Sequence, residues 1–169
     1  MMRKSSVLFV LWVVVFGLTA CQTPPEKKAG LSVEQVTALK QEGFVESEEG
    51  WEFSASEKLL FSANEAALTT NAREALDRIA RMLVRMDIPA VRVDGHTDST
   101  GSASYNDQLS LRRAQEVANV IVAAGMPSDN VGVRGLGSRF PVTSNNTADG
   151  RSQNRRVVLV IGDNGKLAK

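Results

Sequence analysis

The chain has 169 residues and a hydrophobic fraction of 43%, which is enough for one packed domain and does not suit a disordered chain. Its formal net charge is +1, and loss of Arg3 and Lys4 with a cleaved leader would leave 18 basic against 19 acidic residues. This near balance gives no electrostatic reason to expect a nucleic-acid partner. The single cysteine, Cys21, and single histidine, His96, exclude an internal disulfide and a zinc site with four Cys or His ligands. We expect no metal and no cofactor.

Residues 1–20 have the layout of a secretory signal peptide. Arg3 and Lys4 give a basic start, and residues 7–18 (VLFVLWVVVFGL) are apolar and uncharged. The apolar run is shorter than the roughly 20 residues that a membrane-spanning helix needs. A retained membrane helix is therefore the less favoured interpretation.

Residues 18–21 (LTAC) resemble the lipobox of bacterial lipoproteins. The resemblance implies that Cys21 carries a diacylglyceryl thioether and an N-acyl chain, and that it becomes the first residue after cleavage. Two or more acyl chains anchor a protein stably, whereas one holds it only reversibly. Gln22 in place of an aspartate favours transfer to the outer membrane. We therefore expect a lipid-anchored protein at the periplasmic face of that membrane.

The segment between the cysteine and the domain is expected to contain a tether and a short helix. Residues 21–30 are polar with a Pro-Pro pair, which is typical of an extended tether. Residues 31–43 predict a helix that Ser32 caps, with Gln35 completing a capping box and Gly43 ending it. Such a helix is marginal alone, so its apolar side chains need a cover. That cover is the protein's own domain, a second copy in a homodimer, or a partner protein.

A single domain is predicted over residues 50–162, followed by a tail at 163–169. Alternation of apolar residues with Glu52 predicts a strand at Trp51 and Phe53, which residues 59–61 (LLF) could extend or repeat. Helical spacing predicts a helix over residues 70–86, whose apolar positions are Ala72, Leu76, Ile79, Ala80 and Leu83.

The second half of the domain continues the same alternation of strands and helices. Strands are expected at residues 91–95 and 131–133, with a second helix over residues 104–124 and a buried strand at 157–161. This order predicts an α+β two-layer sandwich, with helices packed on a small mixed β-sheet.

The loop at residues 95–102 (GHTDSTGS) is the first candidate binding element. Loops that leave strand ends are common ligand sites because a rigid sheet positions them. Its glycines and small hydroxyl residues leave main-chain amides accessible, so a nest for an anionic group can form. An ordinary turn is the alternative, and the loop alone favours it.

Arg113 adds a second candidate. At 100° per residue it falls in the middle of an apolar helix face, whereas Arg112 points away. A buried arginine needs an acidic counterpart, and Asp98 on the preceding loop is the nearest by topology. The pair either forms a structural ion pair or stays open and holds a zwitterion. The apolar face consists of Leu109, Val117, Val120, Ile121 and Ala124.

Residues of this region resemble the signature of the OmpA-like peptidoglycan-binding domain in order and spacing from about Trp51 to Ile161. In that family the ligand is the diaminopimelate of the peptidoglycan stem peptide. The resemblance implies that Asp98 takes its ammonium and Arg113 its carboxylate. It also implies assistance from the amides of Ser99, Thr100 and Gly101 and a further polar contact from Asn64. The matching residues are Asp94-Gly95-His96-Thr97-Asp98, Tyr105-Asn106, Leu109-Ser110, Arg113-Ala114, Gly135-Leu136-Gly137, Pro141, Asn145 and 150–157 (GRSQNRRV).

The residues before the domain are similar to YfiB-type outer-membrane lipoproteins, on 30–32, 34–35, Leu39, 43–44 and 49–51. The resemblance implies capture of a periplasmic inhibitor protein, YfiR, which releases the diguanylate cyclase YfiN, raises cyclic-di-GMP and promotes biofilm. The regulatory segment is then residues 31–49, and the partner-binding residues are Leu31, Val36, Leu39, Phe44 and Trp51. A purely structural tether between membrane and wall is the alternative.

His96 and Asp98 raise the question of whether the domain is catalytic. His96 and Asp98 alternate onto one side of their chain, like half of a catalytic triad, but no nucleophile motif lies nearby. We expect no enzymatic activity and no catalytic residue, with His96 a hydrogen-bonded structural residue.

Arg155 and Arg156 should face opposite sides of the last strand. One of them can border the ligand loop, although a role in solubility and packing at the sheet edge is favoured.

Overall fold

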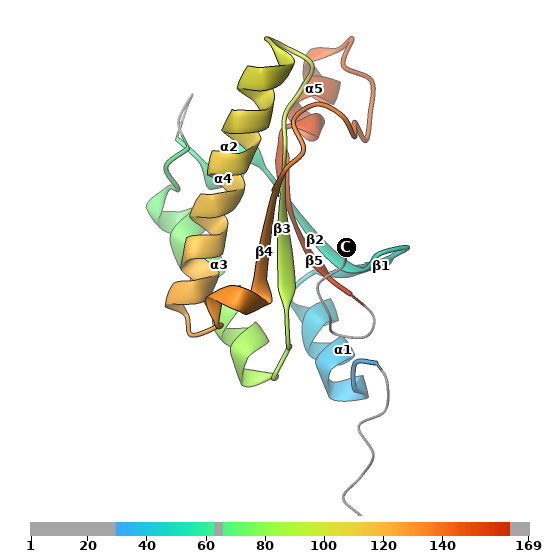
Figure 1. Cartoon of the computed structure of the whole chain (residues 1–169). Helices are drawn as coiled ribbons and strands as arrows, with labels where there is room; N and C mark the ends of the chain where they lie inside the picture. The colour runs from blue at the N-terminus through green and yellow to red at the C-terminus, as the bar shows by residue number, and fades with distance from the viewer. Residues whose placement is uncertain (1–29, 63–65, 163–169) are drawn as a thin grey trace, which may run out of the picture.

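The computed structural model describes residues 30–62 and 66–162, and Figure 1 shows helices packed on a twisted five-stranded sheet. The predicted signal peptide, Cys21, Asn64 and the C-terminal tail lie outside the described residues. The elements are, in chain order, α1 (Val33–Gln41), β1 (Val45–Ser47), β2 (Gly50–Ser56), α2 (Glu57–Leu60), α3 (Thr70–Arg85), β3 (Val91–His96), α4 (Ala103–Ala123), a 3-10 turn (Ser128–Asn130), β4 (Val131–Gly135), α5 (Ala148–Asn154) and β5 (Arg156–Ile161).

The sheet is mixed and runs in the order β1-β2-β5-β3-β4. The β3–β4 pair is parallel, and the pairs β1–β2, β2–β5 and β5–β3 are antiparallel. Helix α4 makes the crossover that a parallel pair requires. The predicted α+β sandwich with a small mixed sheet is thereby confirmed.

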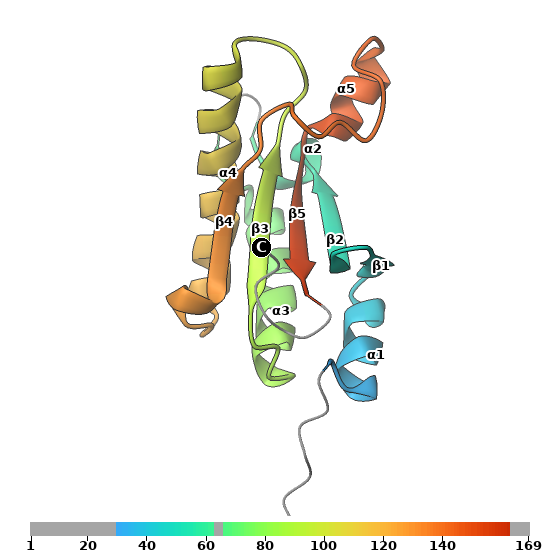
Figure 2. The ribbon, with the colours of Figure 1, turned by 45° about the vertical axis from the view of Figure 1, so that its right-hand side comes forward.

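One face of the sheet carries the hydrophobic core. Figure 2 shows α3 and α4 behind the strands, on the face to which the odd-numbered residues of β3 and β5 point. Val91 and Val93 are fully buried there, and α3 meets them with the apolar stripe predicted from its helical spacing. The predicted strands and both long helices are confirmed, with α4 capped by Ser102.

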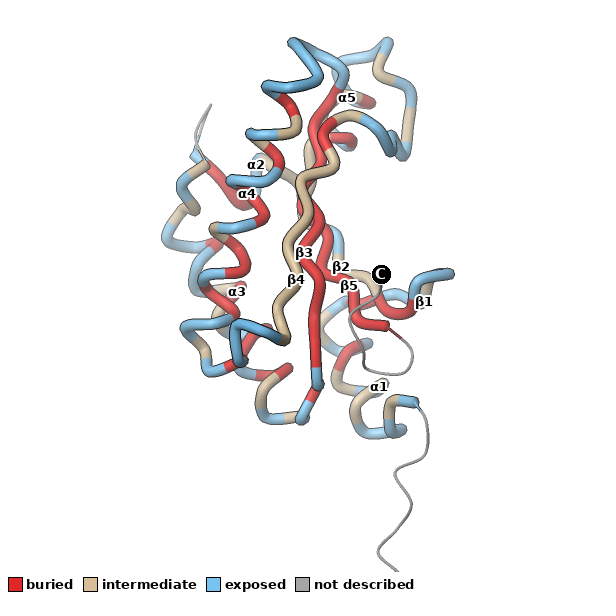
Figure 3. Tube along the Cα trace, viewed as in Figure 1, coloured by how far each residue is buried: buried red, intermediate tan, exposed pale blue. Residues whose placement is uncertain are grey.

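Helix α1 packs against the end of this same core (Figure 3). The predicted capping box is present, because Ser32 Oγ accepts from Gln35 N and Gln35 Oε1 accepts from Ser32 N. Gln35 Nε2 also donates to the carbonyl of Met86, at 2.8 Å. Leu39 and Phe44 are 0% and 2% exposed, so the described domain itself covers the apolar side of α1.

Residues 59–61 do not extend the first strand, and this prediction was wrong. Ser56 has extended backbone and starts α2, a single helical turn, after which Phe61 forms an isolated bridge with Leu68. Leu60 and Phe61 are buried because the turn directs them toward the core. The sequence analysis also missed β1 and α5. Both are short, and neither offers enough residues for a periodicity to be read.

None of the helices in the described ranges is both long enough and apolar enough to cross a membrane.

Candidate functional site

A cavity of about 710 Å³ lies where the loop after β3 meets the start of α4, α2 and α5. Asp98 and Arg113, the two charges predicted to bind ligand, both line it. Thr97 and Thr100 contribute from the loop, and Leu109 from α4. The remaining lining residues are Glu57, Lys58, Phe61, Ser62, Tyr105, Asn106, Arg151 and Arg155.

Asp98 is held in a tight local turn. Its Oδ1 accepts from the amide of Thr100 at 2.8 Å, and its Oδ2 accepts from Arg155 at 2.7 Å. Burial opposes ionisation of this carboxyl, but the Thr100 amide and the Arg155 guanidinium outweigh it and lower the pKa of Asp98. Asp98 is therefore a fixed carboxylate at neutral pH, with its position set before any ligand arrives.

Arg113 is 4% exposed, as its place in the apolar stripe of α4 predicts. Its guanidinium donates to Glu57 Oε1 at 2.8 Å and lies over the ring of Phe61, with the central carbon 5.2 Å from the ring centroid. An acidic partner and an aromatic face are the two surroundings that make a buried guanidinium tolerable. Arg112, its neighbour, is exposed.

The ion pairs among the described residues do not join Asp98 to Arg113. Arg113 pairs with Glu57, and Asp98 pairs with Arg155. Arg155 also reaches Glu57 Oε2 at 2.9 Å, so four charges alternate in sign as Arg113, Glu57, Arg155, Asp98. The two predicted charges are thus kept apart on one cavity, each neutralised by a third residue.

Glu57 is a residue of this cavity that the sequence analysis missed, and Arg155 is one for which it favoured another role. Glu57 opens α2, a helical turn that the sequence analysis did not predict, and it is 56 positions from Arg113. Arg155 lines the cavity, so the favoured role at the sheet edge was wrong for it, and the alternative that one arginine borders the ligand loop holds. The predicted alternation is confirmed, because Arg155 lines this cavity and Arg156 lines the cavity on the opposite face of the sheet.

The loop amides predicted to form a nest already have acceptors at two positions. The amide of Ser99 donates to Asn145 Oδ1 at 3.2 Å, and that of Thr100 donates to Asp98. Asn106 Nδ2 ties the loop further, through the carbonyls of Asp98 and Thr100. The loop is therefore rigidly built, and Gly101, with a φ of +91°, allows its turn.

His96 and Asp98 do not share a side, contrary to the sequence analysis. Strand β3 ends at His96, and His96 lies on the sheet face that the helices leave open, whereas Asp98 faces the cavity described above. His96 Nδ1 is buried without a hydrogen-bond partner within the described part of the chain. We expected His96 to be a hydrogen-bonded structural residue, and for Nδ1 this expectation is wrong.

The predicted partner-binding residues lie together at one end of the domain. Leu39, Phe44 and Trp51 belong to the core, while Leu31 and Val36 are partly buried against it. The Nζ of Lys40 lies 5.3 Å from the Trp51 ring centroid.

The fold and this charged, rigidly framed cavity define a small two-layer binding domain on a mixed sheet. The chain belongs to the OmpA family, whose family model matches residues 60–155. The family resemblance that the sequence motifs indicated is confirmed.

Individual proteins extend the likeness over most of the chain. This chain is 48% identical to the outer-membrane lipoprotein YfiB of Pseudomonas aeruginosa over 151 residues, which is 89% of each chain. It is 40% identical to the peptidoglycan-binding protein ArfA of Mycobacterium tuberculosis over 103 residues, 61% of this chain and 32% of ArfA. The solved structure of the cell wall anchor of the T6SS from Pseudomonas aeruginosa matches with a TM-score of 0.63 and 26% identity, covering 80% of this chain and 99% of that one. The YfiB likeness confirms the predicted location at the outer membrane.

Proposed function

We propose that the protein binds peptidoglycan non-covalently through the Asp98–Arg113 cavity, without performing chemistry on it. The ligand is the diaminopimelate of the stem peptide, a side chain that ends in both an ammonium and a carboxylate. The names of ArfA and of the T6SS cell wall anchor support peptidoglycan as the ligand class.

One observation carries the proposal: Asp98 and Arg113 line the same cavity, and neither neutralises the other. A zwitterion that presents an ammonium to Asp98 and a carboxylate to Arg113 matches this separation of charge. The guanidinium fork binds a carboxylate through two parallel hydrogen bonds, which a lysine cannot reproduce.

The neighbours of the two charges suit a ligand that arrives by exchange. Glu57 holds the Arg113 fork and Arg155 holds the Asp98 carboxylate. A diaminopimelate carboxylate and ammonium replace or join these internal partners, so that the buried charges are never left unpaired. Each new contact contributes about 1–3 kcal/mol.

Anchoring makes such modest contacts sufficient. We propose that residues 1–20 are removed, that Cys21 is lipidated and that residues 21–30 tether the domain of residues 50–162. Membrane and wall then each hold one end of the protein, which raises the effective concentration of the second contact. If Cys21→Ser gives a protein that is still recovered in the membrane fraction at the parental level, the lipidation proposal is wrong.

Sedimentation with purified sacculi tests the binding site. Asp98→Ala and Arg113→Ala are expected to fold and to lose roughly tenfold or more in sacculus affinity. Arg113→Lys should also be impaired because the fork is lost. Arg112→Ala is the matched control, since Arg112 is the exposed neighbour on the same helix. Parental binding by all three site variants would refute the assignment.

A second function is favoured by the extent of the YfiB likeness, which takes in 89% of this chain rather than the domain alone. We propose that residues 31–53 capture a YfiR-like periplasmic protein and thereby activate a YfiN-like cyclase. Because Leu39, Phe44 and Trp51 lie in the core, capture of a partner through them requires α1 to detach from the rest of the domain. Val33 and Val45, 78% and 64% exposed, are accessible without that change.

Surface substitutions separate this function from a purely structural tether. Val33→Glu and Val45→Glu leave the core intact. On sacculi, the parent chain should retain a periplasmic protein, and each of the two variants should fail to retain it. Sacculus binding by the variants themselves should be unchanged. If mass spectrometry finds no protein retained by the parent, or the same protein retained by both variants, the signalling proposal fails and the tether remains.

A further inference from the structure

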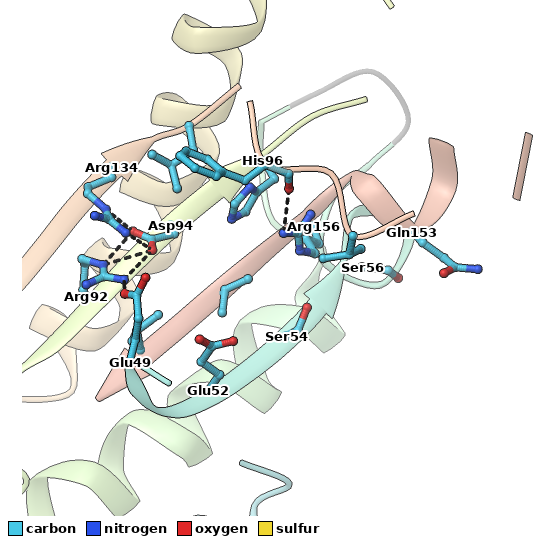
Figure 4. Close-up of a pocket in the computed structure, with 15 residues that line it drawn as sticks. Glu49, Glu52, Ser54, Ser56, Arg92, Asp94, His96, Arg134, Gln153 and Arg156 are labelled. Atoms are coloured by element: carbon cyan, nitrogen blue, oxygen red, sulfur yellow. Dashed lines mark hydrogen bonds and ion pairs between the residues drawn. The ribbon is translucent and has the colours of Figure 1, made fainter. Parts of the chain in front are cut away.

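A second cavity, of about 640 Å³, lies on the face of the sheet opposite α3 and α4. Figure 4 shows its labelled side chains, which come from β2, β3, β4 and β5, with the addition of Glu49 from the turn between β1 and β2 and Gln153 from α5. Phe140 and Val142, 58% and 63% exposed, form part of its wall. It is separate from the Asp98–Arg113 cavity, so a ligand here is independent of the proposed peptidoglycan site.

The β4 side of this cavity is electrically balanced. Asp94 accepts two hydrogen bonds from Arg134, at 2.8 and 2.7 Å, and two from Arg92, both at 3.0 Å. Arg92 also pairs with Glu49. Burial opposes ionisation of Asp94, but the hydrogen bonds from Arg134 and Arg92 outweigh it and lower its pKa. Two cations and two anions here satisfy one another.

The other end of the cavity has a different character. Pairing across the strands sets Ser56 opposite Arg156, and Arg156 opposite His96. Residues directly opposite on neighbouring strands share a face and bring their side chains close together. A hydroxyl, a guanidinium and an imidazole therefore stand in one row across β2, β5 and β3, as the labels in Figure 4 show.

Arg156 contributes a positive charge to this row, and Glu52 lies near enough to act on that charge without forming an ion pair with it. Its guanidinium donates to the main-chain carbonyls of Asn154 and Phe140, both at 3.2 Å. No carboxylate of residues 30–62 or 66–162 forms an ion pair with it. Glu52 faces the same cavity but accepts a hydrogen bond from Ser47 instead, at 2.8 Å. The cation thus retains donor capacity for an outside acceptor.

His96 is the second feature of this row that points to an acceptor as ligand. It is 6% exposed, and its Nδ1 is buried with no hydrogen-bond partner in the described part of the chain. Burial, together with the charges of Arg156 and Arg134, lowers the pKa of His96 to about 4 against a smaller opposing effect of Asp94. The ring is therefore neutral at pH 7, and its Nδ1–H tautomer can donate one hydrogen bond. A buried polar nitrogen left unpaired is costly, so a turn of the ring that brings Nδ1 to an acceptor in the cavity is favoured.

We propose that this open-face cavity binds a carboxylate that is attached to an apolar group. The carboxylate lies against the Ser56–Arg156–His96 row and accepts hydrogen bonds from it. The apolar part lies over Val158, which is the next open-face residue along β5, and against Phe140. The ligand is either a free aliphatic acid or the carboxyl terminus of a peptide that ends in an apolar residue.

The charges of the cavity select a single negative charge. Glu49, Glu52 and Asp94 balance Arg92, Arg134 and Arg156 in number, so the cavity has no net positive charge, and Arg156 is the arginine of this lining that forms no ion pair within the described residues. A phosphate dianion would bring a second negative charge toward these acids, and an amine would face Arg156 directly. A monocarboxylate meets neither repulsion.

The unique histidine makes a direct test available, because its imidazole signals need no assignment among others. The probe is isobutyrate, added to the full chain in detergent at pH 7 while the His96 side-chain carbon–proton signals are followed by NMR. We expect saturable shifts with isobutyrate, and an affinity at least about tenfold lower for isobutyramide, which has the same shape without the charge. Equal shifts for the acid and the amide, or none for either, would overturn the proposal.

Variants and peptides complete the test. Arg156→Gln should lower the affinity for isobutyrate about tenfold or more, whereas Asp98→Asn in the other cavity should leave that affinity unchanged. Parental binding by Arg156→Gln overturns the proposal, and if that variant does not fold, the comparison of acid with amide still decides. A tripeptide ending in valine distinguishes the two sources: tighter binding than isobutyrate, lost on amidation of its terminus, indicates a peptide ligand, and weaker binding indicates a free acid.

Discussion

Glu57 and Arg155 form an ion pair with 2.9 Å between Oε2 and Nε, and each also pairs with one of the two charges predicted to bind ligand. Glu57 reaches Arg113, and Arg155 reaches Asp98. The pair therefore occupies the positions that we propose for a zwitterionic ligand. The Glu57 carboxylate contacts Arg113, and the Arg155 guanidinium contacts Asp98. Because of this double role, a change at either residue should have a measurable effect on ligand binding.

Neutralising Glu57 should affect binding and stability in opposite directions. Glu57→Gln removes the carboxylate that competes for the Arg113 fork, so sacculus affinity is expected to rise. The same change removes one charged partner of a buried guanidinium, so unfolding free energy should fall by about 1–3 kcal/mol. Sacculus sedimentation and chemical denaturation measure the two effects, with Glu74→Gln on the exposed side of α3 as control. A loss of sacculus affinity in Glu57→Gln would mean that Glu57 supports the ligand rather than competing with it.

Arg155 should set the lower pH limit of wall binding. It is one of the groups that lower the pKa of Asp98, so Arg155→Gln is expected to raise that pKa and leave less carboxylate at mildly acidic pH. Affinity of the variant should therefore fall more steeply than that of the parent as pH falls below neutral. Carbon NMR of the Asp98 carboxyl measures its pKa directly. An unchanged pKa would show that the Thr100 amide alone sets the charge state.

His96 should make folding stability rise with pH between about 4 and 6.5. Its pKa is lowered to about 4 by burial and by the charges of Arg156 and Arg134, against the ordinary value of 6.5. In this window the unfolded chain binds a proton that the folded chain excludes, so stability is fully present above pH 6.5 and is lost as pH falls toward 4. The loss from this group is about 3 kcal/mol at most. Denaturation of the parent and His96→Phe across this range tests it, and parallel pH profiles would contradict it.

Gly95 should tolerate no side chain. A Cβ at this position would lie 2.0 Å from the main-chain oxygen of Ser110, so α4 packs directly on the backbone of β3. Gly95→Ala must push the helix from the sheet, and unfolding free energy is expected to fall by about 1–3 kcal/mol or more. Thermal denaturation measures the loss. A variant as stable as the parent would mean that α4 can shift without cost.

Local periodicity was sufficient to predict the parts of the fold and site that it controls. The 3.6-residue spacing of α4 placed Arg113 inside an apolar face, and the position of Asp98 after β3 placed it near that helix. Glu57 could not be found this way, because its contact with Arg113 spans 56 positions and depends on a single turn of helix. Arg92 and Asp94 alternate with Val91 and Val93 along β3, and this alternation gives no sign that the two charged residues are buried. They are 3% exposed each, because Arg134 and Glu49 neutralise them on the open face.

We propose that wall binding by this protein depends on a small zwitterion that bridges the cavity between Asp98 and Arg113. The sharpest test is calorimetric titration of the full chain in detergent with a muropeptide carrying diaminopimelate and with its lysine counterpart, because lysine keeps the ammonium and lacks the carboxylate. We predict binding of the diaminopimelate form, at least about tenfold weaker binding of the lysine form, and loss of this difference in Arg113→Lys. Equal affinity of the parent for the two muropeptides would show that no carboxylate is bound at Arg113.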